Sequence, residues 1–355
     1  MDWLRGLAVL FMIQCHAMVL MTPQLRVSRA FHILVRLDGL VAPSFILAAG
    51  FSLGLILVRA AMAGKLRDRV KKTSKRVAEV FAVAAAYTIV FLNGLHYLSS
   101  WNRVEILHCI ALSLVICLAL AAALAPRPLV LSIVAPSLGF LVFALSPFAE
   151  YAQGAFGHLV NPKSGSMFPL CPWLGYALIG LALGAETSRA GVKGLLRACL
   201  ILLAVGMVLD FFRPQIVAAY PPHNEWVTSP AEAGIRIAKV MGVTVVLMGV
   251  ERWVKAAEKL PPLRLLGFFG TNSLGGYFFH EVFIYIPIFG LCFVRFWRDQ
   301  CGWWEYTGLT VALIALTMGA CIAWNYLWEW LTTQLTRRWA ALRGGSPRKN
   351  ALSPR

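Results

Sequence analysis

Residues 2–16 read DWLRGLAVLFMIQCH, and this stretch decides which kind of protein to expect. Most of its side chains are apolar, yet Asp2, Arg5 and His16 can each carry a charge. Together with the apolar residues that follow, it forms a run over 3–21, close to the ~20 residues that an α-helix needs to cross a bilayer. A titratable group in hydrocarbon is costly and usually faces a functional cavity. The stretch therefore predicts a membrane-spanning helix that carries functional groups.

The composition extends this prediction to the whole chain. The 355 residues are 59% hydrophobic and only 14% charged, whereas about 25% of the residues of soluble proteins are charged. We therefore expect an all-α polytopic membrane protein with about ten transmembrane helices. The expected spans are 3–21, 38–60, 77–98, 104–125, 129–147, 168–186, 195–211, 232–250, 266–294 and 304–330.

The positive charge of the chain follows its expected topology. Lys and Arg concentrate in alternate connections and in the C-terminal tail, which is the positive-inside pattern and predicts that both termini are cytoplasmic. The net charge of +17 is thus explained without nucleic acid, which we do not expect as a partner. We expect one transmembrane domain over 1–335 and a basic, disordered cytoplasmic tail over 336–355.

Arg5 and His16 are separated by eleven residues, close to three helical turns, so they share one helix face. On the functional interpretation, Arg5 lies at the inner mouth of a cavity. His16 lies deeper in this cavity and accepts a proton from a hydroxyl or amine of a substrate. Asp2 lies three residues before Arg5 and can pair with it. The alternative is that Arg5 reaches the inner headgroups and that His16 only bonds to a neighbouring helix.

Polar residues also open two other spans. Glu105 and His108 are three residues apart at the start of span 104–125, where an acid partner can fix the tautomer of the histidine; the alternative is a polar clamp between helices. Asp38 opens span 38–60, where it either lines the outer mouth of the cavity or stabilises a helix N-terminus as an acid.

Span 266–294 contains the polar residues Asn272, Ser273, His280 and Glu281. Asn272 and Ser273 are candidates for substrate binding, as is His280, and the alternative is a packing seam between helices. Adjacent residues on a helix point about 100° apart. We therefore expect that His280 and Glu281 do not both face one small site.

Residues 65–76, KLRDRVKKTSKR, form the most basic connection, which we expect to be a cytoplasmic loop. It either anchors the chain on anionic lipid or binds a phosphorylated ligand, with Lys72 and Arg76 as the candidate contacts. We expect no metal, because the chain has no CxxC, no HExxH and no paired metal-binding acids.

Four segments resemble, in the same order, bacterial relatives of heparan-α-glucosaminide N-acetyltransferase. They are DWLRGLAVLFMIQCH (2–16), RVEILHCIALSL (103–114), FPLCPWLGYALIGLALG (168–184) and FGTNSLGGYFFHE (269–281). The arginine, ten residues and histidine from Arg5 to His16 also match a signature of the wider membrane acyltransferase superfamily.

The resemblance implies an enzyme of the bacterial inner membrane. Acetyl-CoA would donate an acetyl group from the cytoplasm to an acceptor, a sugar hydroxyl or amine, on the outer side. His16 would be the catalytic histidine, as base or as acyl carrier, and Arg5 its motif partner. His108, Asn272, Ser273 and His280 fall in similar segments. His32, in the connection after the first span, is the alternative catalytic histidine.

A second class of function fits the same features. Buried His, Glu and Lys in about ten spans also suit a proton-coupled transporter or a flippase of a sugar or lipid-linked intermediate. Against it, no inverted repeat and no matched pair of broken helices is evident. Acyl-CoA, an outer glycan acceptor and membrane lipids are the expected partners, and the oligomeric state stays open, with a homodimer as one option.

Overall fold

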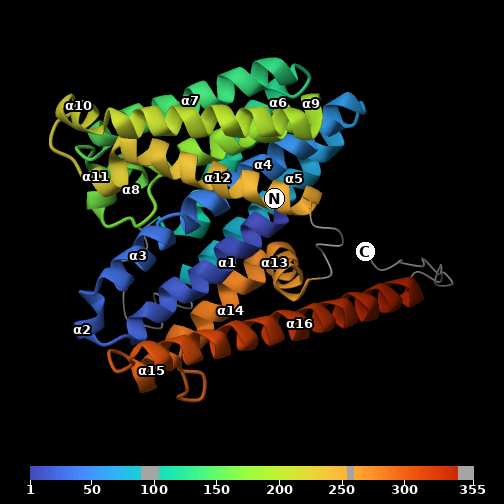
Figure 1. Cartoon of the computed structure of the whole chain (residues 1–355). Helices are drawn as coiled ribbons and strands as arrows, with labels where there is room; N and C mark the ends of the chain where they lie inside the picture. Colours follow the sequence, from blue (N-terminus) through green and yellow to red (C-terminus); the bar gives the residue numbers. More distant parts are fainter. Residues whose placement is uncertain (89–103, 254–259, 343–355) are drawn as a thin grey trace. The chain divides into compact units, whose positions relative to one another are not determined.

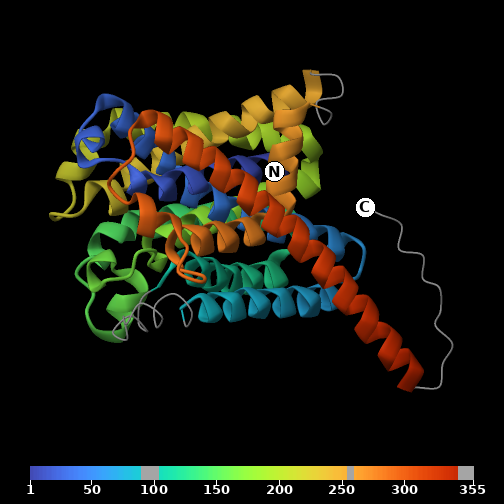
Figure 2. The same cartoon turned by 90° about the horizontal axis from the view of Figure 1, so that it is seen from below.

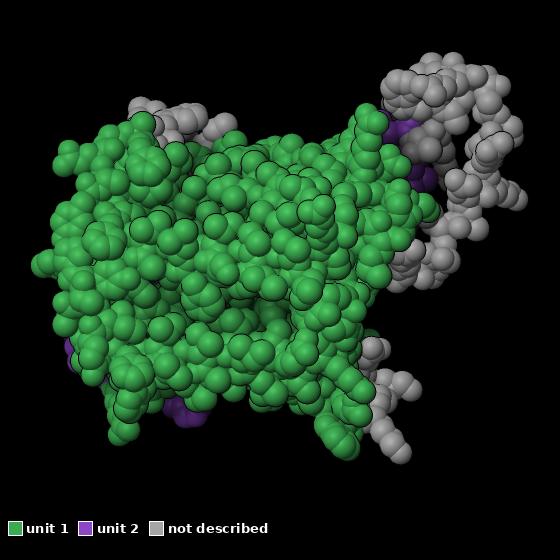
Figure 3. Space-filling view, turned by 90° about the horizontal axis from the view of Figure 1, so that it is seen from above, with its two compact units in different colours: residues 1–11, 29–271 green, residues 12–28, 272–355 purple. Residues whose placement is uncertain are grey.

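A computed structural model describes residues 1–88, 104–253 and 260–342, with side chains described as far as residue 335. The described part is helical and contains no β-strand, only the isolated bridges Met21–Cys301 and Ile288–Leu291. It forms two compact units, one of residues 1–11 and 29–271 and one of residues 12–28 and 272–355 (Figure 3). Helix α1 (Asp2–Ala17) begins in the first unit and ends in the second.

Unit 1 is built around helix α9 (Leu170–Phe211). Its other elements are α3 (Arg29–Asp38), α4 (Val41–Met62), α5 (Leu66–Tyr87), α6 (Ile106–Leu124), α7 (Pro128–Ala149), α8 (Gly154–Val160), η4 (Pro162–Ser164), α10 (Arg213–Ala218), α11 (Glu225–Thr228), α12 (Pro230–Trp253) and α13 (Pro261–Thr271). Helices α4, α6, α7 and α12 all pack on α9 (Figures 1 and 2).

Unit 2 contains the end of α1, η1 (Met18–Leu20), α2 (Pro23–Arg26), α14 (Ser273–Tyr285), α15 (Phe293–Trp297) and α16 (Trp303–Leu342). Helix α14 packs along α16, which is the long red helix of Figure 1. Helix α16 continues to Leu342, so the backbone of residues 336–342 is helical where the sequence predicted a disordered tail. Residues 343–355 of that tail lie outside the described residues.

Within the described residues, seven helical segments are long and apolar enough to cross a membrane. They are Asp2–Leu20, Arg29–Met62, Ile106–Leu124, Pro128–Ala149, Leu170–Phe211, Pro230–Trp253 and Trp303–Leu335. Helix α9 holds two expected spans, 168–186 and 195–211, on either side of Gly191, whose φ of 65° interrupts the helix. The predicted polytopic all-α architecture is confirmed, whereas the count of ten, the cytoplasmic termini and the single domain over 1–335 stay predictions.

Of the two other expected spans, one lies only partly within the described residues and the other is broken. Span 77–98 lies partly in α5, and its residues 89–98 are outside the described part. Span 266–294 is broken between α13 and α14 at Asn272 and ends at Tyr285. A proline disfavours helical backbone in the residue before it, and Pro287 follows the extended residue Ile286. The local sequence thus overrides the apolar character of this span.

Glycines let α4 and α9 approach until their backbones nearly touch. A Cβ on Gly50 would lie 2.0 Å from the carbonyl oxygen of Ala177, and one on Gly180 would lie 2.0 Å from that of Leu47. Gly184 makes a similar approach to Phe51, at 2.1 Å. Such small-residue contacts are typical of helix pairs in membranes. The glycine spacing of segment 168–184 therefore serves helix packing.

We predict that Gly180→Ala lowers the stability of the protein by about 1–3 kcal/mol, because the added methyl group meets a backbone oxygen that cannot move alone. Gly249→Ala is the matched control, since a Cβ there meets nothing within 4 Å. The control should keep or raise stability, because alanine favours a helix over glycine by about 1 kcal/mol. Thermal unfolding in detergent measures both, and equal melting temperatures would contradict this packing.

Glu150, directly after α7, joins three segments of unit 1. Its buried carboxylate contacts Lys163 Nζ at 2.7 Å and accepts a hydrogen bond from the Asn224 backbone N–H at 2.8 Å. The Thr228 hydroxyl donates to the same carboxylate. Burial alone would raise the pKa of Glu150, but these hydrogen bonds outweigh burial and hold the pKa below its ordinary value.

The lowered pKa of Glu150 predicts a pH dependence of stability. The stabilisation is fully present above the pKa of an unfolded glutamate, about 4.3, and is lost as the pH falls through the lower folded pKa. Glu150→Gln should cost about 1–3 kcal/mol at pH 7 and flatten the acid limb of a plot of melting temperature against pH. If the melting temperature of the variant falls with decreasing pH as steeply as that of the wild type, Glu150 is not the cause of this acid destabilisation.

Candidate functional site

The imidazole of His16 lies in the last turn of α1, within reach of two polar groups of α14. Its Nδ1 is 3.0 Å from Glu281 Oε1 and 3.3 Å from the Tyr285 hydroxyl. Glu281 and Tyr285 are four residues apart and therefore share one face of α14. The His16 side chain is 34% exposed, whereas Glu281 is buried. A half-accessible imidazole is thus held against a buried carboxylate.

His280 lies beside this pair. Its ring centroid is 5.1 Å from that of His16, and its Nε2 is 3.6 Å from Glu281 Oε1. The expectation that His280 and Glu281 do not both face one small site is therefore wrong. The Cβ directions of neighbouring residues do diverge, but both side chains are long enough to approach the same third group. Here that group is His16, which comes from a different helix.

The tautomer of His280 follows from its hydrogen bond. Nδ1 is 2.8 Å from the carbonyl oxygen of Gly276, and since a carbonyl only accepts, Nδ1 carries the hydrogen. In neutral His280 the Nε2 atom is then a bare acceptor. This atom is buried and has no hydrogen-bond partner among the described residues.

The end of α1 is fixed to unit 2 by several contacts around His16. Gln14 Nε2 donates to the Tyr306 hydroxyl of α16 at 2.7 Å, and this hydroxyl donates to the Gln14 carbonyl at 3.2 Å. Arg26 pairs with Asp299 and donates to the Val19 carbonyl at 2.9 Å. These contacts hold the backbone on both sides of His16, so the imidazole is positioned before any substrate binds.

Hydrogen-bonding rules indicate what the His16–Glu281 pair can do. An ionised carboxylate only accepts, so His16 Nδ1 carries a hydrogen and donates it to Glu281. The other ring nitrogen, Nε2, then holds a lone pair and can take a proton from a substrate. A carboxylate behind the ring also stabilises the imidazolium that forms. The arrangement is that of a general base with an orienting acid.

Asn272 and Ser273 lie at the opposite end of α14 from this cluster. Nine residues separate Asn272 from Glu281, which is about 13 Å along a helix. Asn272 accepts a hydrogen bond from Asn325 of α16 at 2.8 Å. Of the predicted residues in span 266–294, the structure brings His280 to His16 but not Asn272 or Ser273.

The other predicted site residues belong to unit 1. Arg5 pairs with Asp2, as the spacing predicted. His108 lies in the first turn of α6 and is half-buried, and Glu105 is the residue that precedes that helix.

Asp38 is the last residue of α3, two residues before Leu40, the N-cap of α4. The interpretation of Asp38 as an acid at a helix N-terminus is therefore wrong, because the connection after the first span is itself helical.

Lys72 and Arg76 lie on an exposed face of α5, four residues apart. The sequence placed them in a loop, which is wrong, since helix α5 begins at Leu66. Long straight-chain residues such as lysine and arginine favour helices, so a basic stretch can extend an apolar helix beyond the bilayer. The alternative histidine, His32, is exposed on α3.

Two residues of the cluster escaped the sequence analysis, Glu281 and Tyr285. Glu281 was expected to point away from the site of His280, and no motif marks Tyr285. Their spacing of four residues on a helix that also carries a buried histidine is the signal that points to them. Nothing local indicates that this face meets His16, which is far away in the chain.

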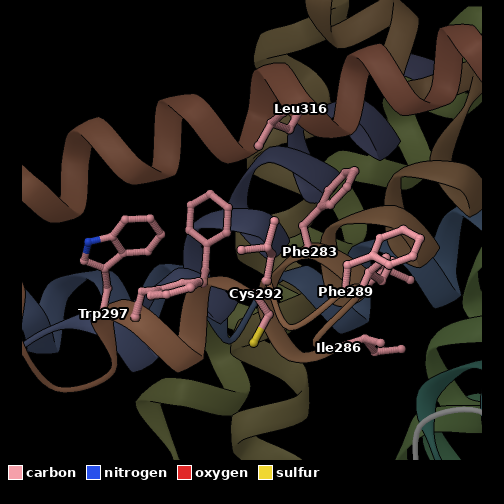
Figure 4. A pocket seen from close by; sticks show the side chains of 11 residues that line it. Phe283, Ile286, Phe289, Cys292, Trp297 and Leu316 are labelled. Atoms are coloured by element: carbon pink, nitrogen blue, oxygen red, sulfur yellow. The ribbon is translucent and has the colours of Figure 1, made fainter.

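Unit 2 also contains an apolar pocket of about 450 Å³. Figure 4 shows its lining, which includes Phe283 of α14, Ile286 directly after that helix, Trp297 of α15 and Leu316 of α16. Val282 and Phe283 of α14 line this pocket, whereas Glu281 and Tyr285 of the same helix contact His16. The lining has no charged group, so this pocket does not suit the phosphates of a nucleotide cofactor.

A family model described as heparan-alpha-glucosaminide N-acetyltransferase, catalytic, matches residues 1–208. The chain belongs to this family. The match confirms the resemblance seen in the sequence and, with the seven apolar helices, identifies a multi-pass membrane acetyltransferase. No curated protein and no solved structure matches the chain.

The matched region contains His16 but ends within α9. His280, Glu281 and Tyr285 therefore lie outside it, and their place in the site rests on geometry alone.

Proposed function

We propose that the protein transfers an acetyl group from acetyl-CoA, bound from the cytoplasm, to a sugar hydroxyl or amine on the outer side of a bacterial inner membrane. His16 is the catalytic residue, and Glu281 is the residue that orients it. The observation that carries this proposal is the 3.0 Å contact between His16 Nδ1 and Glu281 Oε1 in a chain of an acetyltransferase family.

The reaction balances with His16 as the only proton carrier. Nε2 of His16 takes the proton from the acceptor O–H or N–H while the acceptor atom attacks the thioester carbon. The C–S bond then breaks, and the proton passes from His16 to the sulfur of CoA. Holding the acceptor and the thioester within about 3–3.5 Å of each other supplies much of the rate enhancement.

An acyl carrier is the alternative role for the same atom. In that route Nε2 of His16 itself attacks the thioester and CoA leaves as its thiolate. The acetylated imidazole then passes the group to the acceptor, whose proton goes to the thiolate. Both routes need the hydrogen on Nδ1, which Glu281 holds in place. Mass spectrometry of protein incubated with acetyl-CoA and no acceptor separates them, because only the carrier route leaves an acetyl group on His16.

We assign the remaining predicted residues to supporting roles. Lys72 and Arg76 attract the phosphates of CoA at the cytoplasmic end, since CoA carries several negative charges. Arg5 lines the inner mouth, His108 polarises the thioester carbonyl, and Asp38, Glu105, Asn272 and Ser273 contact substrate. Each of these roles follows from the sequence and the family rather than from a contact with His16.

The rival function is a proton-coupled transporter or flippase. The break at Asn272 between α13 and α14 favours it, because transporters bind substrate at interrupted helices. Such a protein would move a solute into liposomes without any requirement for CoA. The family match favours the transferase.

We predict that His16→Gln lowers kcat for acetyl transfer by about 10²–10⁴-fold, the usual contribution of a general base. Glu281→Gln should give a smaller loss, because Nε2 survives but the ring is less well oriented. His32→Gln is the matched control, the same substitution at an exposed imidazole, and should retain full activity. Single-turnover acetylation in nanodiscs measures all three. Full transfer by His16→Gln with loss in His32→Gln would move the site to α3.

Lys72→Ala with Arg76→Ala should raise KM for acetyl-CoA about threefold to tenfold and leave kcat nearly unchanged, with an effect that shrinks as salt screens the charges. Arg29→Ala with Arg36→Ala, on the exposed face of α3, removes the same charge from the segment predicted to be outside. A comparable KM increase in both pairs would indicate a general charge effect and contradict a CoA site on α5.

A further inference from the structure

The environment of His280 contains an unfilled polar position. Its Nδ1 donates to the Gly276 carbonyl, and its Nε2, on a fully buried side chain, has no hydrogen-bond partner among the described residues. Glu281 Oε1 lies 3.6 Å from Nε2. Two lone-pair-bearing atoms therefore face each other in a buried place. Such an arrangement is stabilised by a positive charge between them.

The spacing of the three side chains fits a metal ion. One nitrogen each of His16 and His280 and one oxygen of Glu281 all lie within 4.8 Å of one another. A tetrahedral zinc ion binds nitrogen and oxygen at about 2.0–2.2 Å, so its ligand atoms lie about 3.3 Å apart. The distances from Glu281 Oε1, 3.0 Å to His16 and 3.6 Å to His280, lie on either side of that value.

We propose that His16, His280 and Glu281 form a binding site for a divalent transition-metal ion of the zinc type. Two imidazoles and one carboxylate are a ligand set of catalytic zinc sites, which leave a fourth position open. Imidazole ligands favour zinc, copper or nickel over magnesium and calcium. The sequence predicted no metal because these ligands do not form a short-spacing motif: they come from two distant helices.

The surroundings of the cluster support this assignment. A histidine that binds a metal usually donates its other ring N–H to a carbonyl or carboxylate, and His280 donates to Gly276 in that way. The Tyr285 hydroxyl, 3.3 Å from His16 Nδ1, is a further polar group beside the cluster. The half-exposed His16 ring gives an ion access to the cluster.

Metal binding has a consequence for catalysis, which rests on the proposed function. A zinc ion on Nδ1 of neutral His16 takes the lone pair there, so the ring hydrogen must move to Nε2. A protonated Nε2 accepts no proton and attacks no thioester. The ion is therefore an inhibitor of the transferase that acts on the catalytic imidazole itself, without net loss or gain of protons.

Zinc titration of the purified full-length protein in nanodiscs tests the site directly. Isothermal calorimetry should show one tight Zn²⁺ per chain. His280→Gln should weaken binding about tenfold or more, since the loss of even an outer-shell partner commonly costs 10–100-fold. His32→Gln, which removes an exposed imidazole, should leave the affinity unchanged. Substitution with Co²⁺ should give the visible absorption bands of a tetrahedral ion with nitrogen and oxygen ligands.

Two outcomes would overturn the metal site: no tight binding by the wild type, or an equal affinity in the wild type and His280→Gln. If His280→Gln does not fold, Glu281→Gln, which keeps the side-chain shape, takes its place in the same titration. Zinc binding is measured without any acetyl transfer. A result that contradicts the metal site therefore leaves the proposed transferase activity untouched, and a result that contradicts the transferase activity leaves the metal site untouched. Where both hold, acetyl transfer should fall at the Zn²⁺ concentration that fills the site and return after chelation.

Discussion

The contact between the imidazole of His16 and the buried carboxylate of Glu281 is the interaction on which the functional account depends. It joins the end of α1 to α14, although 264 residues separate the two in the chain. A buried carboxylate is costly unless it is paired, and His16 is the partner that unit 2 supplies. The same contact sets the tautomer of the ring and leaves one nitrogen for chemistry.

The sequence predicted well what depends on short-range physics. Apolar runs of sufficient length give helices in a bilayer because backbone groups there must bond within their own segment. The pairing of Asp2 with Arg5 follows from helical spacing alone. The catalytic role of His16, which rests on a titratable group in an apolar span and on a family motif, stays a prediction.

What the sequence did not predict depends on contacts between distant segments or on local breaks. The meeting of His16 with Glu281 has no local signature. His280 and Glu281 were expected to face different sites, but both side chains approach His16, which comes from another helix. The average hydropathy of a stretch also does not reveal the single residues at which a helix breaks. Asn272 and Pro287 interrupt the long apolar stretch 266–294. Gly191 interrupts α9, whose bounds include both of the expected spans on either side of it.

Glu281 has two roles in this account, and they exclude each other at any one time. With a hydrogen on His16 Nδ1, the carboxylate orients a base. With a metal ion in the cluster, the same oxygen is a ligand and the base is blocked. His280 distinguishes the two states, since it donates to Gly276 in both but binds the ion with Nε2 only in the second.

A density map of the full-length protein with bound acetyl-CoA tests the central claim most directly. The account predicts that the thioester carbon lies beside Nε2 of His16, with Glu281 still on Nδ1 and with the phosphates near Lys72 and Arg76. A thioester placed against His32, or in a site that no atom of His16 reaches, would contradict it.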